Sequence, residues 1–486
     1  MPYAFSASRF TTFTLAVFAS LASLTAGAQT GSQELYADPS IGHAAWRAGS
    51  RLGYAPTPVS IAAMGADPKA WALQQIDLAH AASSQNAVIV PELSRIAAPM
   101  ADVVRDFQAE REARRTLRGQ NALDEPGKSA ASTADGPLFS REMAQGAAAW
   151  RIMACSDPAL ENPLLARMTE FWFNHLNVFA GKGQVRPFVG HYVLNVIRPN
   201  ALGRFEDLLL ASARHPAMLL YLDQAQSSSK GLNENYAREL MELHTLGAGG
   251  GYTQGDVHAL ARILTGWTVN LPGGEGFRFA ERRHDSGTKL FMGRTYQNDG
   301  VKEGEDTIRF LARQPATAHR VSERLAAFFV ADKPPADLVK RLETVFLASQ
   351  GDMRAVMRAL VASPEFWDTG NELFKTPMDF ACSALTASGG AKDRQSIAQA
   401  LGFVAQAGQP VHGWQTPDGY KTDAATWLAP EALTRRADFA MGLGQRIAEP
   451  VYLNAFLSSA TRQRIAREPV SLRSGLTLAS PDFMRK

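Results

Sequence analysis

The sequence predicts a mainly α-helical protein, a large helical array with a small irregular or hairpin insertion near residues 266–299. Three observations carry this prediction. Segments with apolar residues three and four positions apart, typical of amphipathic helices, recur through most of the chain. They show no fixed period, which disfavours a repeat solenoid. The 486 residues are 45% hydrophobic and 20% charged, enough apolar side chains for a large core.

Residues 1–28 are predicted to form a cleavable signal peptide. A single charge, Arg9, precedes an apolar run, and Ala26 and Ala28 place small residues where a signal peptidase cleaves. The run is shorter than the roughly 20 residues that span a bilayer. We therefore expect an exported protein, periplasmic or extracellular, with no transmembrane span in the mature chain.

The mature chain is expected to form one continuous helical domain. Residues 29–118 make its N-terminal helical part and 138–486 its main part, and the polar, glycine-containing segment 119–137 predicts a flexible loop between them. Apolar spacing predicts helices in the main part over 141–155, 161–180, 186–198, 203–213, 216–223, 233–246, 254–266, 303–313, 316–331, 335–349, 351–362, 375–388, 394–406, 429–448 and 451–466. Gly and Pro interrupt short apolar runs over 266–299, which predicts the hairpin or ordered loop.

Charge and cysteine content exclude some classes of function. Lys and Arg number 50 against 47 Asp and Glu, so no strong field favours nucleic acid or an anionic membrane. Cys155 and Cys382 allow one disulfide in an oxidising compartment, but their spacing fits two buried thiols equally well. Two cysteines also disfavour thiol catalysis and a cysteine-based zinc site.

A helix with a clear start and stop lies within the polar segment 223–251. Asn233 is a plausible N-cap and Gly247 a natural C-terminal stop. Glu234, Arg238 and Glu242 follow at intervals of four, which predicts an acid–base–acid ladder on one helix face. This ladder is either an exposed structural feature or a functional cluster that faces a cleft.

Two histidines share helix faces with apolar residues and are expected to be buried. His175 follows Phe171 and Trp172, and His244 follows Leu240 in the same way. The Glu and His spacings of zinc peptidases and di-metal bundles do not occur. The pair is either structural or part of a metal site whose ligands come from separate segments.

The irregular interval contributes a third polar cluster at 282–289. His284 and Asp285 predict either an acid–base pair or residues that cap backbone groups in a turn. Thr253 and Asp256 resemble a capping box at the start of the 254–266 helix. No nucleophile elbow, phosphate loop or dinucleotide fingerprint supports a particular chemistry.

Motifs spread over the mature chain carry a resemblance to a known family. They are Phe171-Trp-Phe-Asn-His175, residues 214–223 and 232–247, Gly251-Tyr-Thr-Gln254, Leu264-Thr-Gly-Trp267, His284-Asp285, Lys375-Thr-Pro377 and Thr416-Pro-Asp-Gly-Tyr420. In these the chain resembles the bacterial proteins catalogued as domain of unknown function 1800. The family pattern has a second histidine where Phe173 stands here, so any metal ligand that such a pair supplies in relatives is missing.

The resemblance implies export and an exported, sulfatase-like partner encoded nearby. Two hypotheses follow: a binding or assembly factor that acts with this partner, or a hydrolase-like enzyme with a Glu/His acid–base site that works with or without a metal. The candidate residues are Glu234, Arg238, Glu242, His284 and Asp285 for catalysis, Asp223, Asn233 and Asn174 for binding, and His175 and His244 for a metal.

Overall fold

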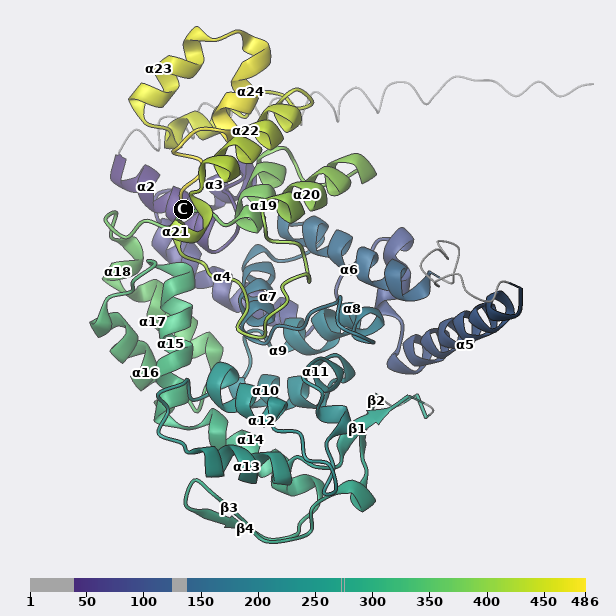
Figure 1. The fold of residues 1–486 in the computed structure, drawn as a ribbon. Helices are drawn as coiled ribbons and strands as arrows, with labels where there is room; N and C mark the ends of the chain where they lie inside the picture. The colour runs from purple at the N-terminus through teal and green to yellow at the C-terminus, as the bar shows by residue number, and fades with distance from the viewer. Residues whose placement is uncertain (1–38, 125–137, 272, 275) are drawn as a thin grey trace, which may run out of the picture.

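In the computed structural model, helices pack around one central helix, α7 (Pro163–His175) (Figure 1). This confirms the predicted mainly α class. The structure describes residues 39–124, 138–271, 273–274 and 276–486. The predicted signal peptide lies outside the described residues, as do residues 125–137 of the predicted loop.

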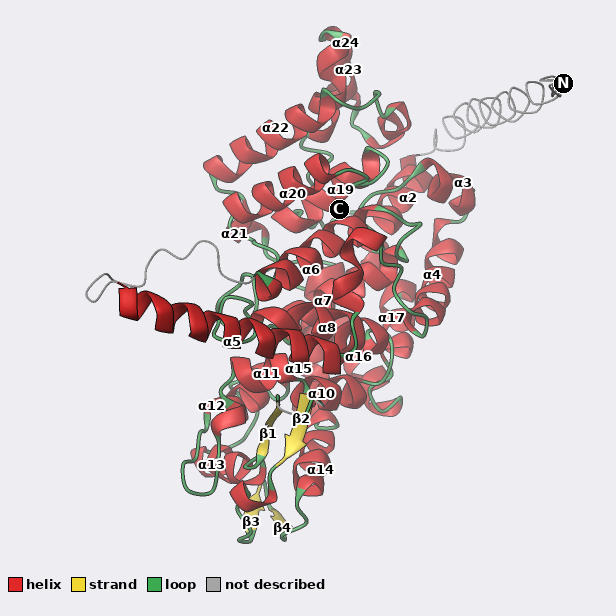
Figure 2. Cartoon of the chain, turned by 90° about the vertical axis from the view of Figure 1, so that its right-hand side faces the viewer, coloured by secondary structure: helices red, strands yellow, loops and turns green. Residues whose placement is uncertain are grey.

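The chain begins with helices that lie behind and beside α7. They are α2 (Pro39–Arg51), α3 (Pro58–Met64), α4 (Pro68–Ser83), the 3-10 turn η1 (Pro91–Ala97), α5 (Met100–Asp124) and α6 (Phe139–Ser156). α5 projects from the body (Figure 2) and extends six residues into the segment 119–137, where we predicted a loop. Gln120, Ala122 and Leu123 are good helix formers, which favours this extension.

Short helices follow in the middle of the chain. They are η2 (Arg186–Phe188), α8 (Val189–Tyr192), η3 (Val193–Ile197), α9 (Arg198–Asn200), α10 (Phe205–Arg214), α11 (Pro216–Tyr221), η4 (Gln224–Gln226), α12 (Asn235–Glu239), η5 (Leu240–His244) and α13 (Gln254–Ile263). η3 and η5 are π-turns inside helices that we predicted as regular. The predicted capping box of Thr253 and Asp256 is confirmed at the start of α13.

The predicted insertion is confirmed as two antiparallel hairpins at one end of the molecule. β1 (Trp267–Asn270) pairs with β2 (Gly276–Phe279), with Trp267 opposite Phe279. After the turn η6 (Glu281–Arg283), β3 (Lys289–Phe291) pairs with β4 (Arg294–Tyr296).

Helices form the rest of the chain. They are α14 (Val301–Ala312), α15 (Pro315–Phe329), α16 (Ala336–Ala348), α17 (Met353–Ala362), α18 (Pro364–Trp367), α19 (Pro377–Ala387), α20 (Arg394–Gln406), α21 (Ala424–Trp427), α22 (Pro430–Gly444), η7 (Val451–Phe456), α23 (Ser459–Arg467) and α24 (Val470–Leu478). α19, α20 and α22–α24 gather at the end opposite the hairpins, with α7 between (Figure 1). No helix in the described part of the chain is long and apolar enough to cross a membrane.

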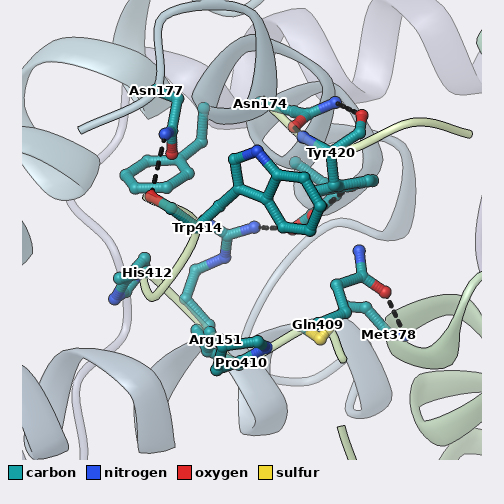
Figure 3. Close-up of a pocket in the computed structure, with 12 residues that line it drawn as sticks. Arg151, Asn174, Asn177, Met378, Gln409, Pro410, His412, Trp414 and Tyr420 are labelled. Carbon is teal, nitrogen blue, oxygen red and sulfur yellow. Dashed lines mark hydrogen bonds and ion pairs between the residues drawn. The ribbon is translucent and has the colours of Figure 1, made fainter. Parts of the chain in front are cut away.

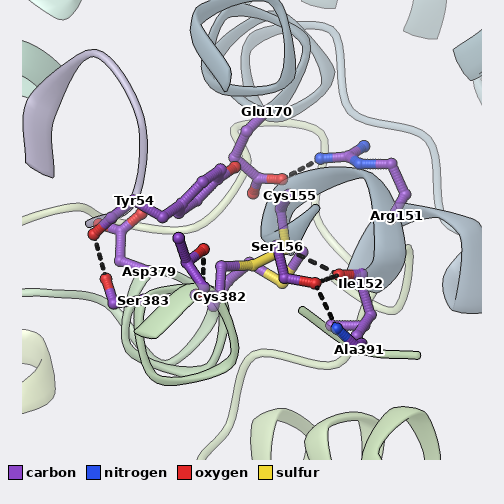
Figure 4. Close-up of a disulfide and its surroundings, with 12 residues drawn as sticks. Tyr54, Arg151, Ile152, Cys155, Ser156, Glu170, Asp379, Cys382, Ser383 and Ala391 are labelled. Atoms are coloured by element: carbon purple, nitrogen blue, oxygen red, sulfur yellow. Dashed lines mark hydrogen bonds and ion pairs between the residues drawn. A yellow bond between two sulfur atoms is a disulfide. The ribbon is translucent and has the colours of Figure 1, made fainter. Parts of the chain in front are cut away.

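Two hydrophobic clusters meet at α7 and α6. The larger cluster takes in α7 and the middle of the chain, and the smaller one joins α19, α20, α22 and α24 to α6. A disulfide between Cys155 of α6 and Cys382 of α19 crosslinks the smaller cluster (Figure 4). It settles the state of the two cysteines, which their spacing left open.

Candidate functional site

The central helix α7 is buried on all sides, so its polar side chains need partners inside the protein. Every residue from Leu164 to His175 is buried. A buried charge is costly unless it is paired and hydrogen-bonded. Arg167 forms an ion pair with Asp379 of α19, and Glu170 forms one with Arg151 of α6. α7 therefore joins the two hydrophobic clusters through charge as well as through apolar packing.

The segment 409–420 crosses the C-terminal end of α7 and is held there by two asparagines. Asn174 donates to the carbonyl oxygen of Tyr420 (3.0 Å) and accepts from its backbone nitrogen (2.8 Å). Asn177 donates to the carbonyl oxygens of Trp414 and Thr416. Gly419 has a positive φ of 72°, and a Cβ there would lie 2.1 Å from the carbonyl oxygen of Asn174. This glycine is needed for the close approach of the segment to α7.

A small cavity of about 30 Å³ lies between α6, α7 and this segment, and we name it the α7 pocket (Figure 3). That volume is room for one or two water-sized groups. Its lining is polar on one side and aromatic on the other. The lining residues are Arg151, Glu170, Phe173, Asn174, Asn177, Met378, Gln409, Pro410, Val411, His412, Trp414 and Tyr420.

Glu170 is fully engaged at the base of the pocket. One carboxylate oxygen accepts from Arg151 and the other from the hydroxyl of Tyr420. Burial and the Glu170 charge raise the pKa of Tyr420 well above its usual value, so the phenol stays a donor. Glu170 thus balances the Arg151 charge and is not free to act as a base.

Other polar atoms of the pocket lack partners. Within the described residues, Arg151 Nη1, Gln409 Nε2 and both ring nitrogens of His412 are buried without a hydrogen bond. Burial, and then the charge of Arg151, holds the pKa of His412 well below its usual value, so the ring is neutral with one donor. Buried polar groups are normally hydrogen-bonded. Three donors, one from α6 and two from the segment 409–420, therefore offer a site for a group rich in acceptors.

Phe173, where the family pattern has a histidine, lies in the wall of this pocket. Its ring centroid is 4.7 Å from that of His412 and 5.6 Å from the Arg151 guanidinium carbon. The residue contributes an apolar face that packs against both groups. Among the predicted binding residues, Asn174 also belongs to this pocket.

The two predicted metal ligands lie next to each other, outside the α7 pocket. His175 and His244 are 0% and 1% exposed, as expected from their apolar faces. His175 donates through Nε2 to the carbonyl oxygen of His244 at 3.0 Å. No group of three or more His, Cys, Asp or Glu side chains in the described residues could hold a metal ion.

The π-turn η5 interrupts the predicted ladder of Glu234, Arg238 and Glu242. Arg238 lies 3.3 Å from Glu234, and both contact Gln254. Glu242 makes no ion pair with Arg238 among the described residues, because the hydrogen bonds of a π-turn join residues five apart and change which side chains are neighbours. Burial, and then the negative charge of Glu242, raise the pKa of Glu239.

His284 and Asp285 have separate partners. His284 Nδ1 donates to the carbonyl oxygen of Thr265 at 2.9 Å, and its Nε2 lies 3.4 Å from both Lys289 Nζ and Glu303 Oε1. Lys289 and Glu303 themselves form a buried ion pair of 2.7 Å.

Asp285 accepts from Arg262 and from the backbone nitrogen of Gly287. The hydrogen bond from Arg262 is the main reason that the pKa of Asp285 falls to about 2. This residue therefore caps a turn, which is one of the two alternatives that its sequence position left open.

The remaining predicted binding residues lie in the loop that precedes α12. Asp223 has a left-handed φ of 60° and pairs with Lys182 at 2.8 Å. Asn233, the predicted N-cap, accepts from the backbone nitrogen of Asn235, but α12 begins one residue later than predicted and its N-cap is Glu234. Neither lines the α7 pocket.

Several pocket residues were missed in the sequence. Arg151 has the pattern of any amphipathic helix, and Gln409, His412 and Trp414 lie between predicted helices without a motif. The one sequence signal for this pocket was the segment 416–420, which is part of the family resemblance but was given no functional role.

Comparison with known proteins gives one match. No curated protein and no solved structure matches the chain. The family model described as "Protein of unknown function (DUF1800)" matches residues 47–485, nearly the whole chain. The motifs at 171–175 and 416–420 that suggested this family meet at the α7 pocket. The chain therefore belongs to the DUF1800 family of proteins of unknown function.

Proposed function

We propose that this chain is an exported binding protein whose α7 pocket receives an acceptor-rich group, a carbonyl or carboxylate, from an exported partner protein. The observation that carries the proposal is the set of unpartnered donors on Arg151, Gln409 and His412 around one small cavity. Leaving buried donors unpaired costs free energy. A ligand that pairs them recovers that free energy on binding.

Two features support export. The first 28 residues have the order of a signal peptide. The disulfide between Cys155 and Cys382 is typical of proteins in oxidising compartments. The partner suggested by family resemblance, an exported sulfatase-like protein encoded nearby, would occupy the same compartment.

The chemistry of the pocket favours binding over catalysis. Its carboxylate, Glu170, is held by Arg151 and Tyr420, and its histidine is neutral and lacks an orienting partner among the described residues. A general base needs a free lone pair near the reacting proton and is usually oriented by a third group. The pocket therefore supplies donors for recognition.

A titration of the purified chain with the co-encoded sulfatase-like protein tests the proposal. The variant is Gln409→Glu, which keeps the oxygen that accepts from Met378 but replaces the free NH₂ donor with a carboxylate oxygen. We expect affinity to fall at least tenfold, because about 1.4 kcal/mol corresponds to tenfold and a lost hydrogen bond to a buried group exceeds it.

The matched control is Gln406→Glu, an identical change at an exposed position three residues earlier. It should bind as the wild type does. Equal binding by wild type and Gln409→Glu, or no complex at all, would contradict the proposal.

The hydrolase hypothesis keeps one specific observation in its favour, the raised pKa of Glu239. A carboxyl group with a raised pKa beside Glu242 is the kind of group that acts as a general acid. Assays with p-nitrophenyl acetate, phosphate and sulfate test it. Turnover that disappears in Glu239→Gln would support an enzyme, and the absence of turnover in the wild type would remove this alternative.

A further inference from the structure

Two arginines one helical turn apart on α15 differ from the paired arginines of α6 and α7. Arg320 and Arg324 are half-buried. Arg320 donates through Nε to the carbonyl oxygen of Leu243 at 3.0 Å. Among the buried and half-buried arginines that the structure describes, Arg324 alone makes no hydrogen bond, ion pair or ring contact. A cation in this position lacks the counterion that burial normally requires.

Two buried histidines, His175 at the end of α7 and His244 at the end of η5, lie next to this contact with Leu243. His175 donates to the carbonyl oxygen of His244, the residue that follows Leu243. His175 Nδ1 and His244 Nε2 are buried and have no partner in the described ranges. The charges of Arg320 and Arg324 act on both rings, which burial keeps neutral by lowering their pKa values. We name His175, His244, Arg320 and Arg324 the α15 cluster.

Carboxylates surround the cluster without touching it. The negative charge of Glu242 favours the charged form of Arg320, and those of Asp418 and Glu323 favour the charged form of Arg324. None of the three carboxylates forms an ion pair with either arginine within the described residues. Their three negative charges outnumber the two positive charges of the arginines. A ligand with two negative charges would therefore be repelled more strongly than a ligand whose single charge lies between the guanidinium groups.

We propose that the α15 cluster binds a single carboxylate, with the Arg324 guanidinium as the main donor and Arg320 and His244 beside it. The planar guanidinium matches the two oxygens of a carboxylate, which makes paired hydrogen bonds possible. The carboxylate belongs either to a small organic acid or to the C-terminus of a peptide. None of these four residues lines the α7 pocket, and the inference does not rest on the function proposed above.

Calorimetric titration of the full mature chain tests this inference, with N-acetylglycine, N-acetylglycinamide and inorganic phosphate as probes. We expect N-acetylglycine to bind saturably at pH 7.5. Its amide, which lacks the carboxylate, and phosphate, which is mostly a dianion, should each bind at least tenfold more weakly. In Arg324→Gln the affinity for N-acetylglycine should fall at least tenfold, since a bond between charged groups contributes more than the 1.4 kcal/mol that tenfold represents.

Arg394→Gln is the matched control, because Arg394 is an exposed arginine at the start of α20 and the change removes the same charge. It should leave binding unchanged. Thermal unfolding of each variant shows that it is folded, and the wild-type midpoint should rise with N-acetylglycine through binding to the native state.

A comparison of acetate with acetyl-Gly-Gly separates the two sources of the carboxylate. Tighter binding of the peptide assigns the site to a peptide C-terminus, and equal affinities assign it to a small acid. No saturable binding below about 10 mM, or equal affinity of Arg324→Gln and wild type, would overturn the proposal.

Discussion

Two groups of residues around α7, named here the α19 side and the histidine side, bury positive charge in opposite ways. On the α19 side, Arg151 and Arg167 each have a carboxylate partner on a different helix, although Arg167 also packs on Phe328 of α15. On the histidine side, which contains His175 and His244 with neutral rings, Arg324 is half-buried without a contacting partner in the described structure. Ion pairs hold separate helices of the fold together. A buried charge without a partner lowers stability, so its presence calls for another explanation. We infer that the first side holds the molecule together and the second is kept for a ligand.

The largest effect should come from breaking a buried pair on the α19 side. Asp379→Ala leaves Arg167 and Lys486, both of which contact Asp379, buried without a counterion. The free energy of unfolding should fall by about 3–5 kcal/mol, measured by urea denaturation. Asp306→Ala, which removes an exposed carboxylate 3.7 Å from Arg309, should change it by less than about 0.5 kcal/mol. A loss below about 1 kcal/mol in Asp379→Ala would make the paired side unimportant.

Removal of the disulfide should weaken the same side by nearly as much. Cys155 and Cys382 are 227 residues apart and join α6 to α19, the helices that provide Arg151 and Asp379 (Figure 4). Loss of a crosslink that closes so long a loop typically costs about 2–5 kcal/mol. The double variant Cys155→Ala/Cys382→Ala should show this loss in urea denaturation. Reduction of the wild type with dithiothreitol should give a similar value, and an unchanged midpoint under reduction would contradict the prediction.

Acid should destabilise the histidine side. Burial lowers the pKa of His244 to about 3 and that of His175 well below the value near 6.5 of an unfolded chain. Below pH 6.5 the unfolded state therefore binds protons that the folded state does not, and stability falls as the pH falls, by about 1.4 kcal/mol per histidine at pH 5.5.

On the α19 side the buried His412 should respond in the same pH range, whereas the ion pairs of Asp379 should respond only at lower pH. Although burial raises the pKa of Asp379, Arg167 and Lys486 hold it below its usual value, so its contribution is complete above about pH 5 and is lost progressively below. Urea denaturation between about pH 7.5 and pH 2 measures both ranges. In the double variant His175→Gln/His244→Gln, the free energy of unfolding should depend less steeply on pH above pH 4, by a slope that corresponds to about two protons. An unchanged slope would show that these two rings do not cause the pH dependence.

The smallest effect, and one of opposite sign, is expected at Arg324. Burial lowers the pKa of Arg324 to about 10, which shows that the surroundings disfavour its charge. Arg324→Met removes that charge and keeps an extended apolar side chain, so the free energy of unfolding should stay equal or rise by up to about 1 kcal/mol. Arg151→Met, the same change on the paired side, should lower it. Equal losses in the two variants would erase the difference between the α19 side and the histidine side.

Local sequence patterns were enough to predict the helical class, most helix positions, the hairpin insertion and the family. These features depend on local pattern: apolar spacing places a helix, and a capping pair such as Thr253 and Asp256 begins it. Burial of His175 and His244 followed from the same spacing. Local pattern fails where a π-turn changes the period, as at η5, where Glu242 leaves the predicted ladder.

Which distant polar residues meet depends on tertiary packing, and no local pattern predicts it. Glu170 lies 19 residues from Arg151 but 250 from Tyr420, and Cys155 lies 227 from Cys382. A sequence shows that such residues are polar, but it does not show which of them burial forces together. Charges and hydrogen-bonding groups inside the protein need partners, and this need determines which residues pair. Arg324 and the free donors of the α7 pocket stand out because the described residues provide no partner for them.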